Sequence, residues 1–153
     1  MIRLSTTRAL LYGTLVVGTL DLADAFVFFG LRGARPIRIL QSIASGLLGR
    51  AAFSGGLGAA VLGAALHFFI AFMVVATFFV ASRYVAVLRR SPLWSGLIYG
   101  IVVYLVMNLV VLPLSAASPG SFTWPVVANG LLIHMLGVGL PSSLFARAGR
   151  ANQ

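Results

Sequence analysis

Four stretches of this chain are apolar for long enough to cross a membrane, and they constrain its fold more than any other feature. Their approximate bounds are 9–31, 57–82, 93–115 and 126–146. A helix needs about 20 mostly apolar residues to span the hydrocarbon core of a bilayer, where the backbone must satisfy its own hydrogen bonds. We therefore predict an all-α fold class: one integral membrane domain over 1–153, built as a bundle of four transmembrane helices.

Composition supports a membrane protein and excludes several other classes. The chain is 60% hydrophobic and 8% charged, whereas soluble domains carry about 25% charged residues. A net charge of +9 suggests nucleic acid at first sight, but the arginines lie between the apolar runs, where positive charge sets membrane orientation. We expect no nucleic-acid partner. The absence of cysteine excludes disulfides, thiol catalysis and cysteine-ligated metals.

The loop arginines predict the orientation in the membrane. Seven share one side, and four lie on the other. The seven are Arg3, Arg8, Arg83, Arg89, Arg90, Arg147 and Arg150, and the four are Arg32, Arg35, Arg38 and Arg50. Because cytoplasmic loops carry the excess of positive charge, we expect both termini in the cytoplasm. The arginine-rich first loop argues the other way.

The first loop contains a helical pattern of its own. From Pro36, apolar residues recur at i, i+3, i+4 and i+7, and polar residues fall on the opposite face. These polar-face residues are Arg38, Gln41, Ser45 and Gly49. We predict an amphipathic helix over about 36–51 that lies in the membrane interface, because it is too short to span. The arginines expected to contact lipid headgroups or a partner are Arg32, Arg35 and Arg38. A lid or docking surface over the outer mouth of the bundle is the alternative.

Few strongly polar residues fall inside the spans, and the sequence places them at one depth. The predicted intramembrane polar layer consists of Asp21, Asp24, His67, Asn108 and His134. At a helical rise of 1.5 Å per residue, all of them lie roughly 10–15 Å below the outer surface. Asp21 and Asp24 are the only acidic residues of the chain. Their spacing puts them on the same helix face. Intramembrane acids usually face a bundle interior or a water-filled cavity.

Small residues at helical spacing predict where the spans approach closely. One stripe runs through the second span and another through the third, and each ends on a polar residue. The residues expected in helix packing are Gly55, Ala59, Gly63, Gly96, Gly100 and Gly130. Such residues let membrane helices pack backbone against backbone. The stripes therefore place the polar layer inside the bundle.

The polar layer has several possible roles, which the sequence leaves open. Its members would hydrogen-bond across helices and fix the packing. Alternatively, His67, His134, Asp21 and Asp24 are candidate ligands for a divalent metal, although no HExxH-like motif is present. The two histidines would also suit axial ligation of haem b. A path for protons or a small solute is the remaining option.

The chain from about 67 to 140 resembles the YagU-like family of bacterial inner-membrane proteins. The residues that carry the resemblance are His67, Leu93-Trp94-Ser95-Gly96-Leu97 at the start of a span, Gly100 within it, Pro113-Leu114 at its end and His134 in the last span. The resemblance implies a small polytopic protein of the bacterial inner (cytoplasmic) membrane. It implies no activity and no cofactor.

Two classes of function remain open. The first is a protein that works through helix contacts, as an accessory or assembly subunit of a larger membrane complex or by self-association. The second is a membrane protein whose polar layer binds haem or a divalent metal, or relays protons or a small solute. We expect no enzyme, because no serine has a triad-like context and no glycine-rich phosphate loop follows a strand. Besides membrane lipids, the expected partners are other membrane proteins.

Overall fold

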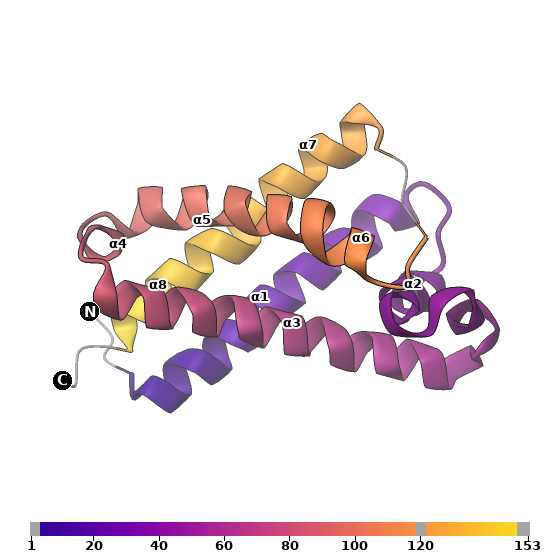
Figure 1. The fold of residues 1–153 in the computed structure, drawn as a ribbon, viewed down its shortest axis with the longest axis horizontal. Helices are drawn as coiled ribbons and strands as arrows, with labels where there is room; N and C mark the ends of the chain where they lie inside the picture. Colours follow the sequence, from indigo (N-terminus) through magenta and orange to yellow (C-terminus); the bar gives the residue numbers. More distant parts are fainter. Residues whose placement is uncertain (1–3, 119–121, 150–153) are drawn as a thin grey trace.

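Long helices form a bundle that a shorter helix covers at one end (Figure 1). The structure, a computed structural model, describes residues 4–118 and 122–149, except for the side chain of Arg89. Arg3, Arg150 and loop residues 119–121 lie outside the described residues. The elements are α1 (Thr6–Gly30), α2 (Pro36–Leu48), the 3₁₀-helical η1 (Gly49–Ser54), α3 (Gly56–Tyr84), α4 (Val87–Arg90), α5 (Pro92–Val106), the π-helical η2 (Met107–Val111), α6 (Leu112–Leu114), α7 (Trp124–Ile133), the π-helical η3 (His134–Gly139) and α8 (Leu140–Ala148).

Four helical stretches are long and apolar enough to cross a membrane. They are Thr6–Gly30, Gly56–Tyr84, Pro92–Leu114 and Trp124–Ala148. The third is continuous through α5, η2 and α6, and the fourth through α7, η3 and α8. Within the described residues the chain is all helical and has no strand. The predicted all-α class with four candidate spans is therefore confirmed, with bounds close to those read from the sequence.

The two ends of the described chain lie at the same end of the bundle. The backbone N–H of Leu4 donates to the carbonyl oxygen of Ala148 at 3.1 Å. The turn with α4, between α3 and α5, is at this end too, whereas α2 and α6 lie at the opposite end (Figure 1). This arrangement is the one expected of four antiparallel neighbours joined by loops.

All four spans contribute to the central core. One cluster of buried residues contains Val17, Ala71, Val75, Val103 and Val138. Many large apolar side chains point outward instead, among them Leu15 and Leu132, which are 55% and 57% exposed. A soluble domain rarely exposes so much contiguous apolar surface. Lipid chains solvate such a surface, so the outward faces are those of a membrane bundle.

The helix expected between the first two spans is present as α2, and its buried residues come from both of the predicted faces. Gln41 and Ser45, expected on the face away from the apolar residues, are 3% and 4% exposed. Gln41 Nε2 donates to the carbonyl oxygen of Gly56 at 2.9 Å, at the start of α3. Leu47, in contrast, is 63% exposed. Small and polar residues favour helix contacts in a membrane, whereas a leucine side chain is as stable against lipid chains as against another helix.

Most of the small residues that were expected to pack helices lie at close approaches within this chain. Gly63 lies against the backbone of Leu40 in α2, so its stripe packs on α2 rather than on another span. Ala59 is buried in a cluster with Ala44 and Ala52. Gly96 and Gly100 lie against Gly139, Leu140, Ser143, His134 and Met135, and Gly130 lies against the ring of Tyr104. Gly55 differs, because the atoms nearest to a Cβ there belong to Ala51, Ala52 and Ala59.

Candidate functional site

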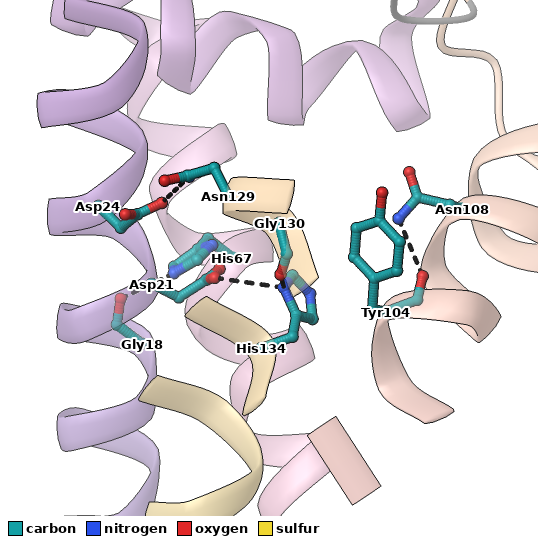
Figure 2. Close-up of polar contacts among 9 residues, drawn as sticks. All are labelled: Gly18, Asp21, Asp24, His67, Tyr104, Asn108, Asn129, Gly130 and His134. Atoms are coloured by element: carbon teal, nitrogen blue, oxygen red, sulfur yellow. Dashed lines mark hydrogen bonds and ion pairs between the residues drawn. The ribbon is translucent and has the colours of Figure 1, made fainter. Parts of the chain in front are cut away.

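The two acids of α1 have different partners. Asn129 Nδ2, in α7, donates to Asp24 Oδ2 at 2.7 Å (Figure 2). This bond joins the first span to the fourth, at a point where α7 has no buried residue. Asp24 is therefore held by an amide donor. The sequence-based polar layer left out Asn129, although an amide inside an apolar run was the signal that could have found it.

Asp21 lies one turn earlier on α1 and faces His134. The distance from Asp21 Oδ1 to His134 Nδ1 is 4.0 Å, and the two side chains are 28% and 18% exposed. His134 Nδ1 lies closer to the carbonyl oxygen of Gly130, at 2.9 Å, and donates to it. Among the described residues no donor makes a hydrogen bond to the Asp21 carboxylate. Figure 2 shows this acid directed toward the imidazole of the fourth span.

His67 joins the second span to the first. Its Nε2 atom lies 2.8 Å from the carbonyl oxygen of Gly18. Because a carbonyl oxygen only accepts, Nε2 carries the proton and Nδ1 is the free acceptor of the neutral ring. Gly18 leaves room for the ring of Phe68, whose nearest atom lies 2.5 Å from the position that a Cβ would take. The histidine therefore satisfies one polar group across the helix interface and retains another.

Asn108 does not bond to the other members of the predicted layer. Its Nδ2 donates to the carbonyl oxygen of Tyr104, one turn earlier, at 2.9 Å. The ring of Tyr104 meets the His134 ring edge to face, with centroids 5.4 Å apart. Asn108 and Tyr104 thus form the third-span side of the site, and the side-chain oxygen of Asn108 stays available as an acceptor (Figure 2).

Two π-helical segments present the polar residues of the third and fourth spans. Asn108 lies in η2, and His134 begins η3. The Leu112 N–H bonds to the carbonyl of Met107, and the Leu140 N–H bonds to that of Met135, five residues back in both cases. A proline follows each segment by two residues, Pro113 and Pro141. Proline lacks an N–H and displaces the carbonyl four residues earlier, which accounts for the wider turns. Such π-turns are frequent at functional sites.

A cavity of about 550 Å³ lies between the spans beneath α2. Asp21, His67, Asn108 and His134 line it, each from a different span, whereas Asp24 does not. Its wall also includes Arg38 and Ser42 of α2. Most of the remaining lining is apolar, including Val17, Phe29, Ile39, Val74, Val103 and Met107. Ligand pockets typically enclose about 300–1,000 Å³ and combine apolar walls with a few polar groups.

The arginines of the first loop lie at the α2 end, and two of them make contacts there. Arg38 Nη1 donates to the carbonyl oxygen of Phe53 at 2.8 Å and to Gln41 Oε1 at 3.3 Å. Arg32 donates to the carbonyl of Phe28 at 2.8 Å, and its guanidinium lies 3.6 Å from the centre of the Phe28 ring. Arg35 is exposed just before α2. All three side chains are exposed, and neither of these two contacts of Arg32 reaches the acids of α1.

Three of the candidate metal ligands, Asp21, His67 and His134, line the same cavity, but they are not grouped as a metal site. In the part of the chain that the structure describes, no three His, Cys, Asp or Glu side chains are grouped so that they could hold a metal ion. Asp24 already accepts a hydrogen bond from Asn129, and His67 Nε2 already bonds to the carbonyl oxygen of Gly18. The described residues therefore lend no support to a metal site built from His67, His134, Asp21 and Asp24. Axial haem ligation by His67 through Nε2 would break its bond to Gly18.

Comparisons of the chain with known protein families, with curated proteins and with solved structures found no match.

Proposed function

We propose that this polytopic membrane protein binds a small amphipathic molecule in the cavity between its spans. The observation that carries the proposal is the convergence of four polar side chains, one from each span, on a single cavity of about 550 Å³. Polar groups are costly inside a membrane and are retained where they serve a pathway or a ligand.

The lining offers polar groups that internal bonds leave free. His67 keeps Nδ1, His134 keeps Nε2 and Asn108 keeps its side-chain oxygen, because the opposite atom of each bonds to a backbone carbonyl. The carboxylate of Asp21 accepts no hydrogen bond from the described residues. If the layer served packing alone, we would expect these groups to bond to one another across the helices, as Asp24 and Asn129 do.

An accessory or assembly role remains the second proposal. Its main support was the abundance of small residues, which form contact surfaces between membrane helices. Here Gly63, Gly96, Gly100 and Gly130 are engaged inside the chain. The outward faces are left with large apolar side chains, which suit lipid as well as a partner, and no contact favours a particular subunit.

The remaining expectations stay predictions. We propose a non-catalytic protein of the bacterial inner membrane, with both termini in the cytoplasm and Arg32, Arg35 and Arg38 near lipid headgroups. Resemblance of 67–140 to the YagU-like family is compatible with this location. We rank haem b below an organic ligand. Nε2 of His134 has a free lone pair that could bind iron, but Nε2 of His67 is held in its hydrogen bond to Gly18.

A cavity-filling substitution tests the proposal. Ala25 lines the cavity, whereas Ala23, on the same helix, is exposed on the outer face. Wild type, Ala25→Phe and Ala23→Phe would be purified in mild detergent and examined by native mass spectrometry, with solvent extraction of any adduct. We expect a defined small-molecule adduct in wild type and Ala23→Phe and its loss in Ala25→Phe. No adduct in any sample, or equal retention in Ala25→Phe, would overturn the proposal.

A further inference from the structure

We infer that the cavity takes an organic cation with an apolar body, and that Asp21 is its counter-ion. This inference rests on the proposed function, because it names the ligand class of the same cavity. Three features support it: the lack of a hydrogen-bond donor to Asp21, the chemistry of the cavity walls and the position of Arg38.

Asp21 and Asp24 form an internal comparison, since they lie one turn apart on the same helix. Asp24 accepts from Asn129 at 2.7 Å and is outside the cavity lining. Asp21 lines the cavity, and its contact with His134 Nδ1 is 4.0 Å long, beyond hydrogen-bonding distance. A carboxylate in a membrane interior needs a donor or an opposite charge. A ligand bound in the cavity would supply that donor or positive charge to Asp21.

The walls suit an organic body rather than a bare ion. Calcium takes about 6–8 oxygen ligands and magnesium about six. Among the described residues, no three His, Cys, Asp or Glu side chains are grouped so that they could hold a metal ion. Phe29, Val103 and Met107 instead present apolar surface to the cavity. An ammonium group bonded to hydrocarbon would bury its apolar part there and leave its charge at Asp21.

Arg38 determines which end of the cavity receives the charge. Its guanidinium is held by the carbonyl of Phe53 and by Gln41, at the α2 end. A cation near Arg38 is repelled, whereas one beside Asp21 is attracted. The two charges therefore orient the ligand, with the cationic group in the polar layer and the apolar body toward α2.

A matched pair of probes separates charge from shape. Phenyltrimethylammonium and tert-butylbenzene have the same outline, but only the first is charged. Binding of radiolabelled phenyltrimethylammonium would be measured with protein in nanodiscs, and tert-butylbenzene would be added as a competitor. We expect the cation to bind wild type at least about tenfold more tightly than the neutral isostere. The neutral compound lacks the Coulomb attraction between a positive charge and the partly buried Asp21 carboxylate.

Two acid variants complete the test. Asp21→Asn should weaken cation binding by about tenfold or more, and Asp21→Glu should retain it. Asp24→Asn is the matched control, and its affinity should stay within about twofold of wild type because Asp24 lies outside the cavity. Equal affinity for cation and isostere would overturn the inference, even if Asp21→Asn failed to fold.

The two proposals fail in different ways. If both probes bind, Ala25→Phe removes both, and Asp21→Asn changes neither, the cavity is a binding site but the cation inference is wrong. If no adduct co-purifies with wild type, or if Ala25→Phe retains the adduct equally, the proposed function itself is wrong.

Discussion

His67 Nε2 lies 2.8 Å from the carbonyl oxygen of Gly18 and so connects the second span to the first. The bond forms at a position where α1 has no side chain, beside the ring of Phe68. A backbone carbonyl already bonded within its helix accepts a second donor here. The same imidazole borders the cavity, so packing and the proposed ligand site share one residue.

Replacing His67 should destabilise the bundle modestly. His67→Ala removes the donor to Gly18, and hydrogen bonds between membrane helices contribute on average about 0.6 kcal/mol, with a maximum of about 1.7 kcal/mol. We expect the free energy of unfolding to fall by about 1 kcal/mol, measured by reversible denaturation in mixed micelles. Phe69→Ala is the control, because Phe69 is the next residue and is 60% exposed. An equal loss in both variants would argue against a specific role of the bond.

A second prediction concerns the close contact between α2 and α3. A Cβ at Gly63 would collide with the carbonyl oxygen of Leu40, which is backbone and cannot rotate away. We expect Gly63→Ala to cost about 1–3 kcal/mol of stability, as overpacking commonly does. Gly58→Ala, in the first turns of the same helix, meets nothing within 4 Å. It should be neutral or stabilising by up to about 1 kcal/mol, since alanine is the better helix former. The melting temperatures of the two variants would check this contrast.

The position of α2 also shows what the sequence could and could not predict. Long apolar runs identified the four spans, because membrane insertion depends mainly on the length and apolarity of each segment. The face of α2 depends instead on its neighbours. Apolar periodicity identifies a stripe containing Leu47, but it does not say whether lipid or protein covers that stripe. Gln41 packs on α3 because its amide donates to the Gly56 carbonyl there, whereas the buried Ser45 hydroxyl donates to the Ser42 carbonyl within α2.

The site was predictable in part for a similar reason. Polar residues inside apolar spans stand out, so four of the cavity's polar groups were found from the sequence. Their partners are set by tertiary packing: Asp24 pairs with Asn129, whereas Asp21 faces His134. The π-turns that present Asn108 and His134 went unnoticed, although Pro113 and Pro141 were their local signal.

A third prediction tests the Asp24–Asn129 bond. A double-mutant cycle with Asp24→Ala and Asn129→Ala should give a coupling energy of about 0.5–1 kcal/mol. Each single substitution already breaks this half-buried bond, so the double mutant loses less stability than the two single losses added together. The free energy of unfolding in mixed micelles is the quantity to measure. A parallel cycle with Asp21→Ala and Asn129→Ala should give coupling close to zero, since Asn129 bonds to Asp24. Comparable coupling in both cycles would place Asn129 between the two acids instead.

The last prediction concerns orientation, and the absence of cysteine makes it direct to test. Ser54, at the α2 end, and Ser91, at the end near the termini, are both exposed. With both termini in the cytoplasm, Ser54→Cys should react with a membrane-impermeant maleimide in intact cells. Ser91→Cys should react only after the membrane is permeabilised, which also shows that its thiol is accessible. The opposite pattern would mean that the four arginines of the first loop, not the seven on the other side, determine the orientation. The α2 end of the cavity would then face the cytoplasm, and so would the apolar body of its ligand.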